Sequence, residues 1–78
     1  MITFQNVMKR IKEILIQETE KKKILDRDIA AALSLDPQYF AVIKRRNKIP
    51  YESIAYFCKT RNISMNWILM EQKPSYLT

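Results

Sequence analysis

A cluster of cationic side chains lies near the middle of the chain. It places four cations within five residues: Lys44, Arg45, Arg46 and Lys48. Ammonium and guanidinium groups bind phosphate oxygens, and Arg does so through a planar fork of donors. The residues before the cluster carry an amide, an aromatic ring and small apolar groups: Gln38, Tyr39, Ala41 and Val42. These side chains suit polar recognition of a polyanion, provided that one element presents them together.

The element that would present them is a helix from Pro37 to about residue 46. Asp36 followed by Pro37 is a strong start signal, because aspartate accepts from free backbone N–H groups and proline has none to leave unpaired. At about 100° per residue, Phe40 and Ile43 share one side and are expected to face the core. The opposite side then presents an amide, two small apolar groups and an arginine, with an aromatic and more cations on the flanks. These residues are Gln38, Ala41, Val42 and Arg45, flanked by Tyr39, Arg46 and Lys44.

This predicted face matches the chemistry of a DNA major groove. Gln can pair bidentately with adenine, Arg with guanine, and Val or Ala can contact a thymine methyl group. A solvated helix face would more often carry Glu–Lys pairs, and this helix has no acid after Asp36. We therefore expect the cluster 44–48, including Asn47, to contact phosphates, although such clusters are also common on ordinary soluble surfaces.

Two helices are expected before this one. Apolar residues at steps of three and four predict a helix over residues 3–20, with Thr3 as its N-cap. They are Phe4, Val7, Met8, Ile11, Ile14 and Leu15. Residues 21–23 are three lysines, expected to close that helix either as a solvated end or as a phosphate contact. Asp26 is expected to cap a second short helix, with Leu25 as an apolar anchor, and Ser34–Leu35 to interrupt it.

Two further helices are expected after the cluster. Pro50 precedes a helix from Tyr51 to about Thr60, whose expected inner stripe is Ile54, Ala55, Phe57 and Cys58. Tyr51 either donates to a phosphate or only packs. Ser64 is expected to cap a fifth helix to about residue 71, with Trp67 and Ile68 inside. The large apolar residues left over, Leu69 and Met70, suggest a dimer interface. Alternatively, the tail 72–78 folds back over them.

Composition restricts the classes of protein that this chain can represent. The 78 residues carry a net charge of +6 and correspond to one domain. With no histidine and one cysteine, we expect no metal site, no cofactor and no catalytic residue, and Cys58 is interpreted as a buried apolar residue. No apolar run approaches the length of a membrane span, so we expect a cytoplasmic, nucleoid-associated protein without a membrane partner. No small-molecule ligand is evident. The chain lacks glycine, which argues against a glycine-rich phosphate loop.

The pattern resembles the helix-turn-helix domains of lambdoid Cro and CI-type phage repressors. The inner alanine, the apolar residues around the turn and the anchors of the next helix have counterparts here. They are Ile29, Ala30, Leu33, Leu35, Phe40 and Ile43, and the ending Asn62–Leu69 resembles the last helix of those repressors. The resemblance implies a compact all-α bundle of five helices with the helix-turn-helix in helices two and three. It implies a DNA-binding domain over residues 1–71 and a short tail over 72–78.

The resemblance also implies roles for individual residues. Base contacts would come from Gln38, Tyr39, Val42, Arg45 and Arg46. Phosphate contacts are expected from Lys44, Asn47 and Lys48 on the ground of the cationic cluster itself, with Arg27 and Tyr51 as further candidates. Two departures stand out: Ser34 replaces the usual glycine of the turn, and the acidic Asp26 occupies a position where relatives touch phosphate. We therefore transfer no DNA role to Asp26.

The expected function is sequence-specific binding of double-stranded DNA by a transcriptional regulator, a phage-type repressor. The resemblance implies a homodimer on a pseudo-palindromic operator with half-sites about one helical turn apart. The chain is then either a free-standing Cro-like regulator or a fragment of a longer repressor. The alternative is a small helical protein-interaction module, an adaptor or antitoxin-like partner that uses the fifth helix. An enzyme is the least supported class.

Overall fold

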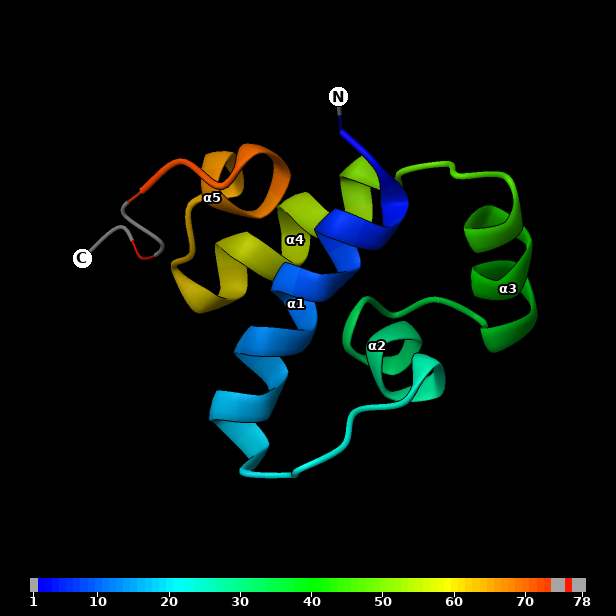
Figure 1. The fold of residues 1–78 in the computed structure, drawn as a ribbon, viewed down its shortest axis with the longest axis horizontal. Coiled ribbons are helices and arrows are strands. Elements are labelled where there is room, and N and C mark those ends of the chain that lie inside the picture. Colours follow the sequence, from blue (N-terminus) through cyan, green and yellow to red (C-terminus); the bar gives the residue numbers. More distant parts are fainter. Residues whose placement is uncertain (1, 74–75, 77–78) are drawn as a thin grey trace.

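The structure is a computed structural model that describes residues 2–73 and Tyr76. This part of the chain is all-α. Its helices are α1 (Phe4–Thr19), α2 (Asp26–Ala32), α3 (Pro37–Arg45), α4 (Tyr51–Arg61) and α5 (Met65–Met70). Helix α1 runs through the middle of the molecule, with α3 at one edge and α5 at the opposite edge (Figure 1). α1 packs against α2 and α5, α2 against α3, and α4 against α5. The arrangement leaves α3 accessible along its outer side.

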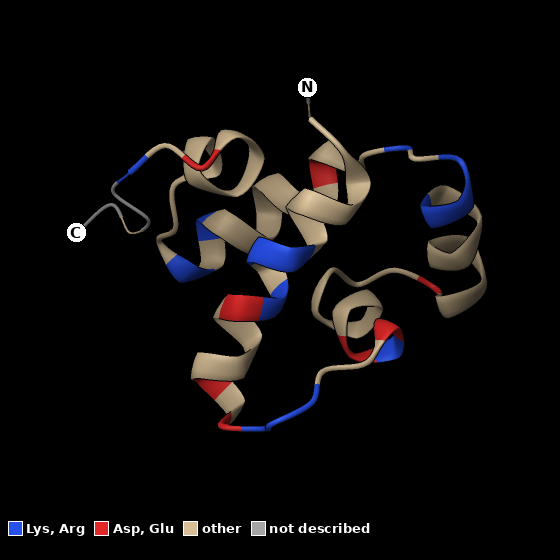
Figure 2. Ribbon diagram, in the orientation of Figure 1, with Lys and Arg blue, Asp and Glu red and all other residues tan. Residues whose placement is uncertain are grey.

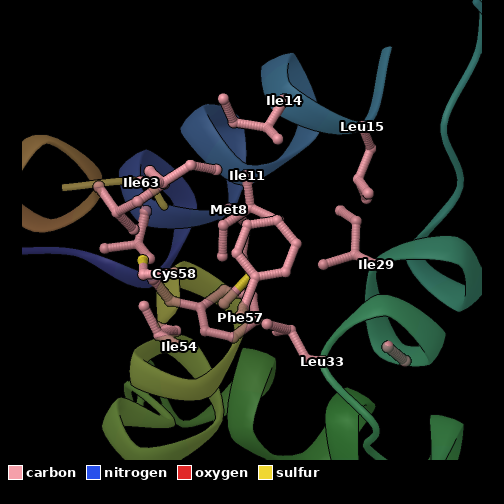
Figure 3. Packing of buried hydrophobic residues seen from close by; sticks show 14 of the residues in the cluster. Met8, Ile11, Ile14, Leu15, Ile29, Leu33, Ile54, Phe57, Cys58 and Ile63 are labelled. Atoms are coloured by element: carbon pink, nitrogen blue, oxygen red, sulfur yellow. The ribbon is translucent and has the colours of Figure 1, made fainter. Parts of the chain in front are cut away.

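One hydrophobic core joins the helices. It is built around α1, and Figure 3 shows Phe57 of α4 surrounded by apolar side chains from several elements. The most deeply buried large side chains are Val7, Ile11, Ile14, Ile43, Ile54, Phe57, Ile63 and Ile68. Ala30 is completely buried, as expected for the inner alanine of α2, and its small side chain lets α2 approach its neighbours closely.

Side-chain caps fix the starts of three helices where the sequence predicted them. Thr3 Oγ1 accepts from the backbone N–H of Asn6 at 3.2 Å. Asp36 Oδ1 accepts from Gln38 N at 2.7 Å and from Tyr39 N at 3.4 Å. Ser64 Oγ accepts from Trp67 N at 3.4 Å. These short-range bonds satisfy donors that each helix leaves free, so the predicted starts of these three helices are confirmed.

Non-glycine residues adopt the left-handed conformation at the turns. Glu20, Ser34, Asn47, Asn62 and Glu71 all have φ between 52° and 59°. Asn tolerates this region because its short polar side chain can bond locally, whereas Ser and Glu carry a steric cost of about 1 kcal/mol. Ser34 therefore takes the conformation that glycine would otherwise supply.

Some expected helix boundaries are wrong. α1 ends at Thr19, so residues 21–23 lie in the connection to α2 and do not close the helix. The N-cap of α2 is Leu25, and the carboxylate that bonds there is Asp28, whose Oδ2 accepts from Leu25 N at 2.9 Å. Asp26 is the first residue of α2 and not its cap. An acid at the third helical position can reach back to the N-cap, which the prediction overlooked.

Some expected core assignments are also wrong. Leu25 is 38% exposed, whereas Ile24 beside it is 4% exposed, so Ile24 is the anchor. Adjacent residues of an extended segment point in opposite directions, which explains the error of one position. Ala55 is exposed and does not belong to the inner stripe of α4, whereas Ile54, Phe57 and Cys58 are buried as predicted.

Tyr76 lies near the junction of α4 and α5. Tyr76 forms a β-bridge with Ile63, and its hydroxyl lies 3.5 Å from Gln17 Oε1. Residues 74–75 and 77–78 of the expected tail lie outside the described residues. No helix in the described ranges is both long enough and apolar enough to cross a membrane.

Candidate nucleic-acid interface

Helix α3 is held against the core by two buried side chains, one aromatic and one aliphatic. Phe40 is 2% exposed and Ile43 is 1% exposed, as the helical wheel predicted. The Phe40 ring packs against the ring of Phe4 on α1, with 5.4 Å between the centroids. Because both anchors point inward, α3 cannot rotate about its axis without exposing them. The side chains on its other side are therefore fixed toward the outside.

The outer side of α3 carries the side chains expected to contact bases. Gln38, Ala41, Arg45 and Arg46 are exposed, Tyr39 is 46% exposed, and Val42 is partly buried. The Asp36 carboxylate bonds the backbone N–H groups of residues 38 and 39, which fixes the first turn from which their side chains project. The structure thus exposes Gln38, Tyr39 and Arg45 on α3 and Arg46 at its C-cap, whereas the predicted base-contacting residue Val42 is only partly accessible.

Cations continue beyond the end of α3. Figure 2 shows them along the end of the helix and in the loop that leads to α4. The backbone of this loop is folded by hydrogen bonds, since Lys48 N donates to Ile43 O at 2.9 Å. Arg46 and Lys48 have no ion-pair partner within the described part of the chain. Their charges remain available to an anion.

Asn47 has a structural contact that the sequence did not reveal. Its Oδ1 accepts from the backbone N–H of Phe4, the first residue of α1, at 2.8 Å. This bond links the end of α3 to the start of α1. A phosphate contact by the Asn47 side chain would use its amide NH₂ group, since phosphate oxygens only accept, and so it is compatible with the bond to Phe4.

Lys44 also has a partner. Its Nζ lies 2.6 Å from Asp26 Oδ2, and the two side chains are 48% and 58% exposed. An open hollow of about 450 Å³ beside this pair is lined by Asp26, Arg27, Pro37, Phe40, Ala41, Lys44 and Arg45. The structure thus brings the predicted phosphate-contacting residues Arg27 and Lys44 next to Arg45, with the Asp26 carboxylate among them.

Tyr51 lies on the other side of the turn between α2 and α3. It is the first residue of α4 and is 50% exposed. It shares an open hollow of about 640 Å³ with Tyr39, Ser34 and Tyr56. Tyr56 is 71% exposed, and the sequence interpretation did not single it out. Half of the Tyr51 side chain is free to meet another molecule.

The proposed dimer residues differ from each other in exposure. Leu69 is partly buried, while Met70 is 51% exposed. Arg10, which the sequence interpretation passed over, is only 8% exposed and holds this helix end. Its Nε donates to Ile68 O at 2.5 Å and its Nη2 to Leu69 O at 3.1 Å. Arg10 stands between Lys9 and Lys12 in the sequence, and nothing in this run of cations signals its role.

Cys58 is free and buried, 4% exposed, as expected for a small core residue. Burial raises the pKa of its thiol from 9.0 to about 11, although the positive charge of Arg61 opposes the shift. The thiol is therefore protonated at neutral pH, and a protonated buried thiol is a poor nucleophile.

Comparisons with protein-family models, with curated protein sequences and with solved structures give no match to this chain.

Proposed function

We propose that this chain is a sequence-specific double-stranded DNA-binding regulator of transcription, of the phage-repressor type that its sequence resembles. In this proposal α2, the turn at residues 33–36 and α3 form a helix-turn-helix, and α3 enters the major groove. The observation that carries it is the two-sidedness of α3. Phe40 and Ile43 are buried, while Gln38 and Arg45 are exposed on the other side of the same helix.

The charge distribution supports the same proposal. The chain carries 14 Lys and Arg residues against 8 Asp and Glu residues. Cations lie at the end of α3 and in the loop after it, next to the surface expected to contact bases (Figure 2). Phosphate contacts at the edge of a base-reading helix fix its register on the duplex. The arrangement therefore fits a helix seated in the groove with its C-terminal end anchored to the backbone.

The first test is selection of bound sites from random duplexes. A palindromic consensus would support both sequence recognition and a homodimer, and its half-site spacing is expected to be about one helical turn. A salt titration on mixed duplex DNA is the companion measurement. Absence of binding even at low salt would reject the proposal.

Two single variants separate base recognition from phosphate contact. Gln38→Ala is expected to weaken binding to the selected site by about 1–3 kcal/mol with little effect on random DNA. Lys48→Ala is expected to weaken binding to all sequences alike and to lower the salt slope by about one. Equal loss on cognate and random DNA from Gln38→Ala would remove it from the base-contacting residues.

A second candidate function rests on α5. Met70 is half exposed and Leu69 is partly buried at the end of this helix, which gives a small apolar surface for a protein partner. A helical adaptor or antitoxin-like module would use this surface, and its basic face would serve solubility alone. Met70→Glu separates the two ideas. It would abolish partner binding in the adaptor, whereas in the DNA-binding protein it would alter dimerisation and leave half-site binding intact.

A further inference from the structure

Helices α1, α2 and α3 border a hollow in which Lys44 is the one residue already expected to contact phosphate. Its volume is about 300 Å³. The floor is apolar and consists of buried residues: Phe4, Met8, Ile24, Ile29 and Phe40. The rim is polar and carries Gln5, Lys9, Lys12, Asp26 and Lys44. Two elements distant in the sequence thus bring three ammonium groups around one open depression.

The balance of charge at this rim is positive. Lys9 and Lys12 are three residues apart on α1, so their side chains lie on neighbouring positions of one helix face. Both are exposed, and neither side chain has a hydrogen-bond or ion-pair partner within residues 2–73 and Tyr76. The single carboxylate of Asp26 already bonds Lys44 at 2.6 Å. Two ammonium groups remain uncompensated, which favours an anion with more than one oxygen.

The hollow continues the surface described for α3. It shares Asp26, Phe40 and Lys44 with the neighbouring hollow that contains Arg27 and Arg45. Cations therefore recur along one flank of α3, from α1 past the Asp26–Lys44 pair to Arg45. The other cationic segment, with Arg46 and Lys48, follows the end of α3 toward α4. The exposed side of α3 is bordered by positive charge from two directions.

We propose that the Lys9–Lys12–Lys44 hollow binds backbone phosphate of the DNA strand that borders the major groove beside α1. This inference rests on the proposed function and extends the DNA contact surface to α1. A helix in the major groove lies between two phosphate backbones, so a protein that grips both fixes the helix more firmly than one that grips one. Lys9 and Lys12 would supply one side of this grip, and Lys48 the other.

The test uses the double variant Lys9→Ala/Lys12→Ala on the duplex selected by the wild-type chain. Each lost phosphate contact lowers the slope of log K against log salt by about 0.9. When salt rises from 50 to 200 mM, the affinity of the variant for this duplex should therefore fall by a factor about tenfold smaller than that of the wild type. The matched control is Lys59→Ala/Lys73→Ala, which removes the same charge from exposed positions outside the hollow. The control is expected to keep the wild-type slope.

A second measurement locates the contact. Single phosphates of the selected duplex are replaced in turn by neutral methylphosphonates. The wild-type chain should lose affinity at one or two phosphates that flank the groove, and Lys9→Ala/Lys12→Ala should no longer respond to those replacements. If the wild type binds tightly and the variant keeps both the wild-type salt slope and the wild-type methylphosphonate profile, this inference is overturned while the proposed function stands. Failure of the wild-type chain to bind any duplex would overturn the proposed function, and the inference with it.

Discussion

The Oδ1 atom of Asn47 accepts a hydrogen bond from the backbone N–H of Phe4, at 2.8 Å and across 43 residues of sequence. Phe4 N is one of the donors that α1 leaves free at its start, so this side chain satisfies a group that would otherwise lack a helical partner. Asn47 also has φ of 52°, which reverses the chain after α3. One residue thus fixes both the end of α3 and its attachment to α1.

Asn47→Ala is expected to lower the free energy of unfolding by roughly 2 kcal/mol, of which about half comes from the lost hydrogen bond and half from the left-handed backbone. Asn47→Gly relieves the backbone but not the bond, so its loss should be about 1 kcal/mol. Asn47→Asp keeps the acceptor and should remain close to the wild type. Urea denaturation of the three variants measures these differences. Equal stability of all three would show that neither the bond nor the conformation matters.

The ion pair between Asp26 and Lys44 gives a prediction about DNA affinity. Asp26→Asn removes the carboxylate that occupies Lys44 Nζ. The free ammonium group is then available to phosphate, so affinity for any duplex should increase and the salt slope should steepen by about one. Stability should change by less than about 1 kcal/mol, because both side chains are largely exposed.

Glu18→Gln is the control for this prediction. It makes the same change of charge in the ion pair between Glu18 and Arg61, in which Arg61 Nε lies 2.7 Å from Glu18 Oε1. This pair lies apart from α3. Titrations of duplex DNA by fluorescence anisotropy at several salt concentrations compare the two variants. Weaker binding by Asp26→Asn, or equal gains in both variants, would contradict a competition between Asp26 and phosphate for Lys44.

Features fixed by neighbouring residues could be predicted from the sequence. The caps at Thr3, Asp36 and Ser64 depend on donors two or three residues away, and all three occur as expected. The burial of Phe40 and Ile43 follows from helical periodicity alone. Ser34 stands where the resemblance implies a glycine, and its left-handed backbone agrees with that place in the turn.

Features fixed by distant residues could not be predicted. The Asn47–Phe4 bond, the Arg10–Ile68 bond and the Asp26–Lys44 pair join residues 43, 58 and 18 positions apart. No period or spacing in the sequence distinguishes Arg10 from the exposed cations around it. The hollow bordered by Lys9 and Lys12 has the same origin, because it exists only where α1, α2 and α3 come together. The partners of these polar side chains are therefore set by how the helices pack, and not by their neighbours in the sequence.

Arg10 gives a prediction about stability. Its guanidinium group is buried and donates to the carbonyl oxygens of Ile68 and Leu69, which α5 leaves free at its C-terminal end. Arg10→Met keeps an apolar stem but removes both donors. The expected loss is roughly 2–3 kcal/mol, as for hydrogen bonds from a charged group to buried acceptors. Lys9→Met, an exposed neighbour, should change the free energy of unfolding by less than about 0.5 kcal/mol.

Chemical denaturation with tryptophan fluorescence suits this measurement, because Trp67 lies on α5 and is buried. Arg10→Lys should fall between the wild type and Arg10→Met, since it keeps the charge but loses the fork of donors. If Arg10→Met and Lys9→Met behaved alike, Arg10 would not hold α5 in place.

Cys58 gives a prediction about stability at high pH. Burial raises the pKa of its thiol from 9.0 to about 11, against the opposing charge of Arg61. Above pH 9 the unfolded chain therefore releases this proton while the folded chain keeps it. The contribution is fully present below pH 9 and is lost as the pH rises toward 11, by about 1 kcal/mol between pH 8 and pH 10. Cys58→Ala has no thiol to titrate, so the stability of this variant should fall less over the same pH interval. Urea midpoints at pH 8 and pH 10 for both proteins measure the difference, and parallel losses would show that Cys58 titrates alike in the folded and unfolded chains.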